Sequence, residues 1–234
     1  MIQHVTDPDS LGKIFDEILQ PSFPPSELIG KKEFLEAAVA SRFDVLGAFE
    51  AAVCTGVIVG ERYDGAILVV WLAVGGSTRA SGTGSALVEA GLERWIKLPG
   101  TQLVLGEVER PDLFDAHPEH GDPERRLAFY SKFGAGALEV PYFQPPIARD
   151  MPRVPGLLLV TLAAKNSDPL PRLLNPAETD AVRNYLESAM DRTNKDDAQT
   201  AAVFAAIDNP EGIRLHRLED YAEVPLPPGV NPQG

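Results

Sequence analysis

The segment that most constrains the fold of this chain covers residues 66–95 and changes character twice. Its first part, AILVVWLAV over residues 66–74, is continuously apolar and bounded by glycines, as expected of a central strand covered on both faces. The middle part contains RASGTG, residues 79–84. The last part is typical of a helix with one apolar face, formed by Leu87, Val88, Gly91, Leu92 and Trp95. The sequence therefore predicts a strand, a glycine loop and a helix in direct succession.

The loop has the composition of an anion-binding turn. The first turn of a helix leaves backbone N–H groups unpaired, and glycines let an anion approach them without meeting a Cβ. A tight turn in which Gly82 and Gly84 adopt unusual dihedral angles explains the same composition equally well. Neither common nucleotide motif fits. A Walker loop needs Lys and then Ser or Thr where Ser85 and Ala86 stand, and a Rossmann loop needs a small residue where Leu87 stands.

Composition and charge narrow the partners of the chain. Of its 234 residues 44% are hydrophobic, which is enough for a sizeable core. The formal net charge of −13 argues against a nucleic-acid or anionic-membrane partner, because such contacts rest on clustered Lys and Arg. We find no signal-peptide pattern and no apolar stretch of membrane-spanning length, so we expect a cytoplasmic protein without membrane contact. The single cysteine, Cys54, has apolar neighbours and is expected in the core.

Apolar periodicity predicts further elements before the glycine loop. Helices are expected over residues 9–19 and 25–40. The buried positions of the second helix are expected to be Leu28, Phe34, Leu35 and Val39. The strand-like segment of residues 43–60 contains Gly56 and Gly60, which suggest turns.

The region after the glycine helix also has clear patterns. A strand is expected over residues 101–109, and its period of two places Glu107 and Glu109 on the same side as two leucines. Asp122 begins a helix that stops at Gly134. Short strands are expected over residues 136–140 and 156–164.

Two ordered motifs resemble those of the GNAT superfamily, the acetyl-CoA-dependent N-acyltransferases. RASGTG matches the pattern (Arg or Gln)xxGx(Gly or Ala) at Arg79, Gly82 and Gly84, with an amphipathic helix behind it. RLAFYSKFGA, residues 126–135, looks like the FYxxxGF element, with alanine in place of the final Phe. The resemblance covers residues 2–164. It implies an α/β (α+β) fold, with a mixed, mostly antiparallel central sheet flanked by helices, as a domain of residues 1–164.

This resemblance implies acetyl-CoA as co-substrate. The strand before the loop would bind the pantetheine arm through backbone groups of Leu72, Ala73 and Val74. The pyrophosphate would lie on the amides of the loop, which comprises Arg79, Ala80, Ser81, Gly82, Thr83, Gly84 and Ser85. The Arg79 side chain would add a charge-assisted contact or would simply be solvated.

The resemblance also implies the reaction, which is direct attack of a small-molecule primary amine on the acetyl thioester in a ternary complex. Tyr130, in the FY element, would protonate the departing sulfur, unless it merely packs on the buried stripe of its helix. Glu107 is the first choice for the base, with Glu109 on the same side. Solvent exposure of both carboxylates is the alternative, and water can relay the proton instead. Tyr142 and Phe143 either line the acceptor site or belong to the core.

An HxxH pattern at His117 and His120, flanked by Asp115 and Asp122, invites a metal site. Pro118 and the loop composition give no helix that would hold the spacing, so we predict a solvated loop and no metal. The two histidines could instead serve the proton relay.

The family pattern ends at residue 164, and we expect a C-terminal helical extension with a Pro-rich tail over residues 165–234. Asn175, Pro176 and Glu178 begin one helix, and residues 198–207 form another. Their apolar faces pack on the core of the same chain or on a second subunit in a homodimer. If these helices form an interaction module, the chain is alternatively a non-catalytic GNAT-like protein that binds acyl-CoA or a protein partner.

Overall fold

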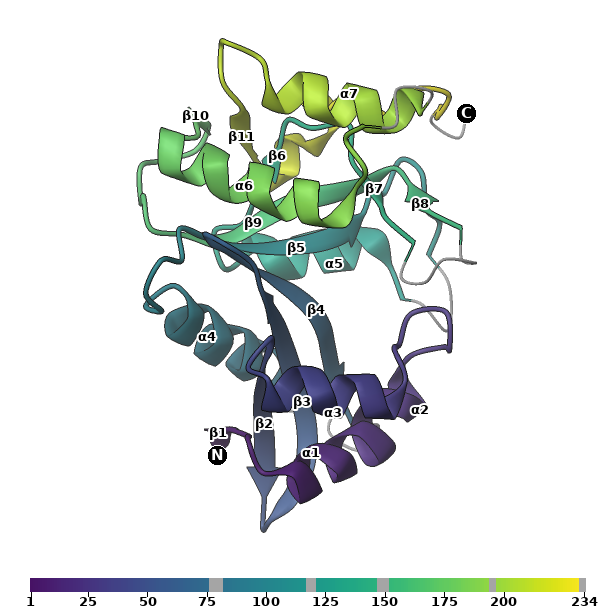
Figure 1. The fold of residues 1–234 in the computed structure, drawn as a ribbon, viewed down its shortest axis with the longest axis vertical. Coiled ribbons are helices and arrows are strands. Elements are labelled where there is room, and N and C mark those ends of the chain that lie inside the picture. The colour runs from purple at the N-terminus through teal and green to yellow at the C-terminus, as the bar shows by residue number, and fades with distance from the viewer. Residues whose placement is uncertain (76–81, 117–120, 147–151, 194–196, 232–234) are drawn as a thin grey trace. The chain divides into compact units, whose positions relative to one another are not determined.

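The computed structural model describes residues 1–75, 82–116, 121–146, 152–193 and 197–231 (Figure 1). The described residues form two compact units. The first unit holds Met1–Arg62 and Ile67–Leu98, and the second holds Tyr63–Ala66, Pro99–Pro146 and residues 152–231. These units are defined by packing, whereas the predicted division at residue 164 concerns where the family pattern ends, and that division stays a prediction. Among the described residues, no helix is both long enough and apolar enough to cross a bilayer.

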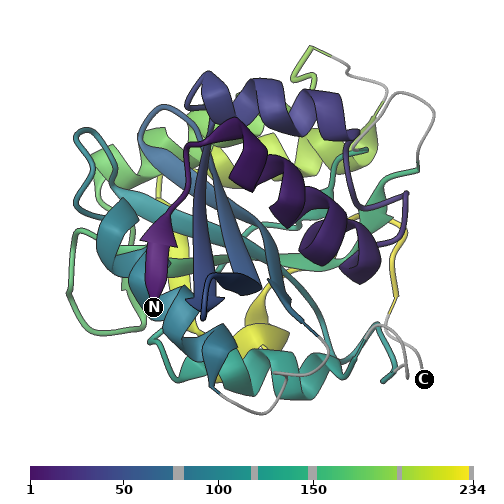
Figure 2. The same ribbon diagram turned by 90° about the horizontal axis from the view of Figure 1, so that it is seen from below.

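The first unit is an antiparallel sheet with helices on both faces. Its strands lie in the order β1 (Ile2–His4), β2 (Phe43–Glu50), β3 (Val53–Arg62) and β4 (Ala66–Val74). One face is covered by α1 (Pro8–Ile14), which continues through a π-helical turn (Phe15–Leu19) into α2 (Gln20–Ser22), and by α3 (Lys31–Val39). The other face carries α4 (Thr83–Trp95), as the second view makes plain (Figure 2). The strand predicted at the start of residues 66–95 and the helix predicted at the end are confirmed as β4 and α4, and most of the loop between them lies outside the described residues.

The glycines of β3 serve packing, and the prediction of turns at Gly56 and Gly60 is wrong. Both lie inside the strand, and the turn falls at residues 51–52, where two alanines have positive φ angles of 46° and 67°. A Cβ on Gly56 would lie 3.1 Å from Cδ1 of Leu87, and one on Gly60 would lie 2.9 Å from the Trp95 ring. The two glycines therefore let α4 pack closely on the sheet.

Helix α3 begins later than its sequence pattern indicates, and one predicted core position is wrong. Phe34, Ala37 and Ala38 are buried, whereas the Val39 side chain is 63% exposed. Successive helical residues are about 100° apart, so Val39, the last residue of the helix, has turned away from the stripe that Phe34 begins. Leu28 precedes the helix and, like Leu35, is only partly buried.

A buried carboxylate fixes the C-terminal end of α4. Asp44 of β2 accepts hydrogen bonds from Trp95 Nε1 at 3.0 Å and Arg94 Nε at 2.8 Å, and from Arg62 Nη2 at 2.6 Å. Burial alone would raise the pKa of Asp44, but these hydrogen bonds outweigh it and lower the pKa to about 2. The helix that follows the glycine loop is thus tied to the sheet at its far end.

The second unit is built on antiparallel sheet strands in the order β5, β9, β6, β11, β10. Its strands are β5 (Leu103–Glu109), β6 (Gly136–Leu138), β9 (Leu157–Ala164), β10 (Arg172–Leu173) and β11 (Arg214–Arg217), and a separate hairpin pairs β7 (Phe143–Gln144) with β8 (Val154–Pro155). Helix α5 (Pro123–Ser131) lies on one side of this sheet, and α6 (Pro176–Ala189) and α7 (Ala198–Ile207) lie on the other (Figure 2). The predicted fold class, helices flanking mostly antiparallel strands, is confirmed.

The C-terminal segment contains more than helices. The predicted start of α6 is confirmed, because Asn175 and Glu178 form a reciprocal capping box. The segment also supplies β11, which pairs with β6 and which the sequence analysis did not predict, and a 3₁₀ helix (Leu218–Glu223). The apolar faces of α6 and α7 are buried within the single chain through Val182, Tyr185, Leu186, Val203, Phe204 and Ile207. A homodimer stays a prediction.

Candidate active site

The predicted phosphate-binding region is described from Gly82 onward. Gly82 caps the N-terminus of α4 in the left-handed conformation, with φ of 78°. The internal hydrogen-bond ladder of the helix begins with the Ala86 amide, which donates to the Gly82 carbonyl at 3.1 Å. The amides of Gly84 and Ser85 lie ahead of that ladder. Among the described residues, a Cβ on Gly84 would come within 4 Å of Val74 Cγ2 alone, at 3.6 Å, so these residues leave room on this side of the helix terminus.

The end of β4 carries the residues predicted to bind the pantetheine arm. Leu72, Ala73 and Val74 pair with β3 in antiparallel register, after a β-bulge at residue 70. Ala73 is buried in the core, while Leu72 and Val74 are partly exposed. The expectation of a strand covered on both faces thus holds for Ala66–Leu68 and is wrong for the end of the strand. The bulge starts an alternation there that leaves every second side chain partly exposed.

Glu107, the predicted base, lies on β5 among hydrogen-bond donors. Tyr142 donates a short hydrogen bond to Glu107 Oε1, and Gln144 Nε2 donates to Oε2 at 2.8 Å. The Tyr185 hydroxyl lies 3.4 Å from Oε1 and 2.7 Å from the Tyr142 hydroxyl. We call Glu107, Tyr142, Gln144 and Tyr185 the Glu107 cluster. All four belong to the second unit.

Burial governs the electrostatics of the Glu107 cluster. Burial raises the pKa of Glu107, and its three hydrogen-bond donors oppose this only in part. Burial first, and then the negative charge of Glu107, raise the pKa of Tyr142 and of Tyr185 well above its ordinary value. Both phenols therefore keep their protons at neutral pH and act as donors. A carboxylate whose pKa is raised toward neutrality is the type of group that accepts and releases protons in catalysis.

Sequence reasoning found only part of this cluster. The sequence predicts Glu107 as the base and leaves Tyr142 open between the acceptor site and the core. The structure buries the Tyr142 ring and also directs its hydroxyl at Glu107. Tyr185 lies on the apolar face of α6, a pattern that by itself predicts only packing, and no local pattern marks Gln144. A tyrosine inside an otherwise aliphatic stripe is the one signal that points to a buried polar partner, because its hydroxyl needs one.

The other carboxylate on the strand has a separate partner. Glu109 Oε2 accepts a hydrogen bond from Arg126 Nη1 of α5 at 2.8 Å, and its side chain is 27% exposed. Glu109 is therefore committed to an ion pair, whereas the donors around Glu107 are uncharged.

Tyr130, the predicted acid, lies in the last turn of α5. Asp122 caps this helix as predicted, and Gly134 beyond its end has a φ of 77°. The Tyr130 ring is partly buried and packs edge-on against Phe129, with 5.1 Å between centroids. Burial raises the pKa of Tyr130, while the nearby Arg126 charge opposes this. The phenol is thus protonated at neutral pH, as a proton donor must be.

Several predicted site residues lie outside the described part of the chain. These are Arg79, Ala80 and Ser81 of the loop, and His117 and His120 of the HxxH pattern. Within the described ranges, no group of three or more His, Cys, Asp or Glu side chains is arranged to hold a metal ion.

Comparisons with known proteins identify similar structures. No family model matches the chain, and no curated protein matches it. A protein of Bacteroides thetaiotaomicron classed as a GNAT-family acetyltransferase is 26% identical, with a TM-score of 0.56, and the match covers 72% of this chain and 88% of the other. The ribosomal-protein-S18-alanine N-acetyltransferase of Escherichia coli is 16% identical, with a TM-score of 0.46 and coverage of 72% and 97%. The GNAT-like decarboxylase GphF, solved with isobutyryl-CoA, is 17% identical, with a TM-score of 0.49 and coverage of 70% and 100%.

Proposed function

We propose that this chain, which has the fold of the GNAT superfamily and is assigned to it, is an N-acyltransferase that moves an acetyl group from acetyl-CoA to the primary amine of a small molecule. The observation that carries the proposal is the start of α4. The RASGTG motif ends there, with left-handed Gly82 as the helix cap and with space beside Gly84 that the described residues leave unfilled. A cytoplasmic location belongs to the same proposal.

The proposed cofactor contacts rely on the backbone. The pyrophosphate would accept hydrogen bonds from amides of the residue 79–85 loop, where the helix dipole adds about 0.3–1 kcal/mol. Backbone groups of Leu72, Ala73 and Val74 would bind the pantetheine arm. Such donors need no lysine, which is consistent with a chain whose formal net charge is −13.

The proposed chemistry needs a base for the ammonium proton and an acid for the departing thiolate. The ammonium group of the acceptor loses a proton to Glu107, directly or through water, and the neutral nitrogen attacks the thioester carbonyl. The tetrahedral intermediate then collapses, the C–S bond breaks, and Tyr130 protonates the departing thiolate. The nitrogen releases its second proton through water to the Tyr130 phenolate, which leaves a neutral amide and restores the phenol. The raised pKa of Glu107 and the protonated state of Tyr130 support these roles. Each proton transfer is typically worth about 10²–10⁴ in rate, and the positioning of both substrates supplies up to roughly 7–11 kcal/mol.

The test follows release of free thiol from acetyl-CoA over a panel of small primary amines. Wild type is compared with Tyr130→Phe and with Tyr221→Phe, a matched loss of a phenol hydroxyl outside the proposed site. We expect amine-dependent thiol release by wild type and by Tyr221→Phe, and a loss of at least 100-fold in Tyr130→Phe.

Calorimetry with acetyl-CoA separates the alternatives. Binding without thiol release on any amine would replace the proposal with a non-catalytic acyl-CoA-binding protein. No binding at all would remove both functions.

A further inference from the structure

The C-terminal segment reaches the Glu107 cluster directly. Tyr185 belongs to α6, which lies beyond the residues that resemble the GNAT pattern. Its side chain is 2% exposed, and its ring packs edge-on against Tyr63, with 5.0 Å between centroids. The ring is thereby held with its hydroxyl at the Tyr142 hydroxyl, 2.7 Å away. A segment outside the family pattern thus supplies one of the polar groups around the proposed base.

The direction of the hydrogen bonds follows from counting protons. A phenol has one proton to donate, and Tyr142 donates it to the Glu107 carboxylate in the short contact. In the 2.7 Å contact Tyr142 must therefore accept, so Tyr185 is the donor. The alternative contact of Tyr185 with Glu107 itself is longer, at 3.4 Å. The result is a chain from Tyr185 through Tyr142 to Glu107, in which each bond polarises the next and strengthens the donor at the carboxylate.

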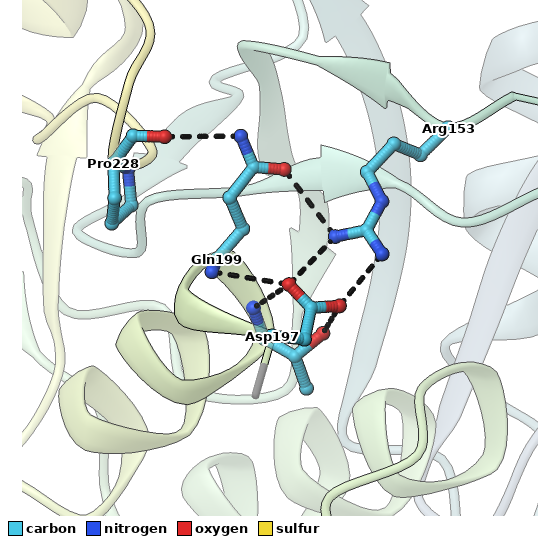
Figure 3. Close-up of polar contacts among 5 residues, drawn as sticks. Arg153, Asp197, Gln199 and Pro228 are labelled. Atoms are coloured by element: carbon cyan, nitrogen blue, oxygen red, sulfur yellow. Dashed lines mark hydrogen bonds and ion pairs between the residues drawn. The ribbon is translucent and has the colours of Figure 1, made fainter. Parts of the chain in front are cut away.

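A second contact ties the C-terminal segment to the hairpin that carries Gln144. Arg153 forms a two-pronged ion pair with Asp197, with Nη2–Oδ2 and Nη1–Oδ1 distances of 2.6 and 2.9 Å (Figure 3). Asp197 is also the N-cap of α7. The Arg153 guanidinium lies over the Phe143 ring, 4.4 Å from its centroid, and Phe143 stands between Tyr142 and Gln144. Gln199 extends the network by donating to the Pro228 carbonyl at 3.1 Å (Figure 3).

From these two contacts we infer that the C-terminal segment completes the base site, and that Tyr185 is a positioning residue that acts on Glu107 through Tyr142. The inference rests on the proposed function, in which Glu107 accepts the proton of the acceptor amine. Tyr185 touches neither substrate nor cofactor in this account. It stabilises the ionised form of Glu107 and holds the carboxylate in one orientation.

The test uses the full chain and removes only hydroxyl groups. Tyr185→Phe keeps the ring and its packing on Tyr63, and the double variant Tyr142→Phe/Tyr185→Phe removes both phenol protons. Tyr221→Phe is the matched control, since its ring contacts Arg110 and not the Glu107 cluster. Thermal melting confirms that each variant folds.

The first measurement is the pH profile of kcat/KM for thiol release. Loss of a donor destabilises the Glu107 carboxylate, so its pKa rises and the acid limb moves to higher pH. We expect a shift of roughly one pH unit in the double variant, the scale of one hydrogen bond to a charged group, and a smaller shift in the same direction in Tyr185→Phe. Tyr221→Phe should leave the acid limb of the kcat/KM profile at its wild-type pH. A merely structural role for Tyr185 would lower activity equally at every pH, and that result would overturn the inference.

The second measurement does not depend on turnover. Carbon-13 NMR of labelled glutamate carboxyls, with the Glu107 signal assigned by its absence in Glu107→Gln, gives the titration midpoint of Glu107. We expect this midpoint to rise in Tyr185→Phe. An unchanged midpoint overturns the inference even if the wild type releases thiol. A wild type that releases no thiol overturns the proposed function instead, and the midpoint still decides whether Tyr185 acts on Glu107.

Discussion

The substitution Gly84→Ala separates the fold of the α4 terminus from its proposed ligand. Gly84 lies in the first turn of the helix, where alanine is conformationally allowed. The added Cβ would lie 3.6 Å from Val74 Cγ2, which is an ordinary van der Waals distance. The described residues around Gly84 therefore accept the methyl group without a clash. A pyrophosphate on the neighbouring amides would not, because the methyl group occupies the approach that glycine leaves open.

Gly84→Ala is expected to leave the stability of the protein unchanged or to raise it, and to weaken acetyl-CoA binding. Alanine is favoured over glycine by up to roughly 0.5–1 kcal/mol inside a helix, and by less in its first turn, so the melting temperature should stay constant or rise by up to about 2–4 °C. Hydrogen bonds to a charged group are each worth about 1.5–3 kcal/mol, so losing one should weaken acetyl-CoA binding roughly 10- to 100-fold. A variant that is as stable as wild type and yet binds less tightly cannot be explained by unfolding.

Gly12→Ala is the matched control. Gly12 also lies in a helix of the first unit, and a Cβ there would lie 3.6 Å from Lys31 Cε, the same distance as in Gly84→Ala. Calorimetry with acetyl-CoA should give a wild-type Kd for Gly12→Ala and a raised Kd for Gly84→Ala. Equal Kd values for the two variants would refute the position proposed for the pyrophosphate.

Three further predictions concern the acid, the buried carboxylate of the first unit and the cap of α7. Tyr130→Phe should lower kcat about 10²- to 10⁴-fold while KM for acetyl-CoA stays within a few-fold, and a loss below tenfold in steady-state assays contradicts proton donation. Asp44 has its pKa lowered to about 2, so its stabilisation of roughly 2 kcal/mol is present above about pH 4 and is lost as pH falls toward 2. Urea unfolding between pH 7 and pH 3 should show that Asp44→Asn loses this part of the pH dependence. Asp197→Ala removes an N-cap and should lower the free energy of unfolding by about 0.5–2 kcal/mol in urea, and an unchanged value would contradict the capping role.

Local patterns predicted the elements that local chemistry determines. The apolar run of β4, the stripe of α4 and the capping box at Asn175 and Glu178 are all encoded within a few residues of the elements they define. The same holds for Asp122, whose carboxylate accepts from the amides of the helix that it begins. Elements whose caps and apolar patterns lie within the element itself could therefore be predicted from the sequence.

The misses at Gly56 and in the Glu107 cluster have a different origin, which is contact between distant parts of the chain. The sequence around Gly56 is typical of a turn, but in the structure Gly56 lies under α4. No pattern near residue 56 predicts that contact. Glu107 and Tyr185 are 78 positions apart, so the polar partner of each is invisible from its own neighbourhood. The aliphatic pattern of α6 does not indicate a partner for the Tyr185 hydroxyl. The alternation of β5 does not indicate which donors surround the Glu107 carboxylate. The Glu107 cluster could therefore be identified only from the three-dimensional structure.

The helix termini show how an acidic chain can offer a site to an anion. In the described part of the chain, helices α1, α5, α6 and α7 have first-turn amides bound by a capping side chain, from Asp7, Asp122, Asn175 and Asp197. A carboxylate or amide at a cap uses up the donors and the partial positive charge that an anion would otherwise meet. Helix α4 begins with Gly82, which has no side chain, and has no acidic residue in its first turn. Its basic residue Arg94 sits at the opposite end, bound to Asp44. Binding at such a terminus would use local backbone donors, so a surplus of carboxylates elsewhere is compatible with the CoA-type ligand proposed for it.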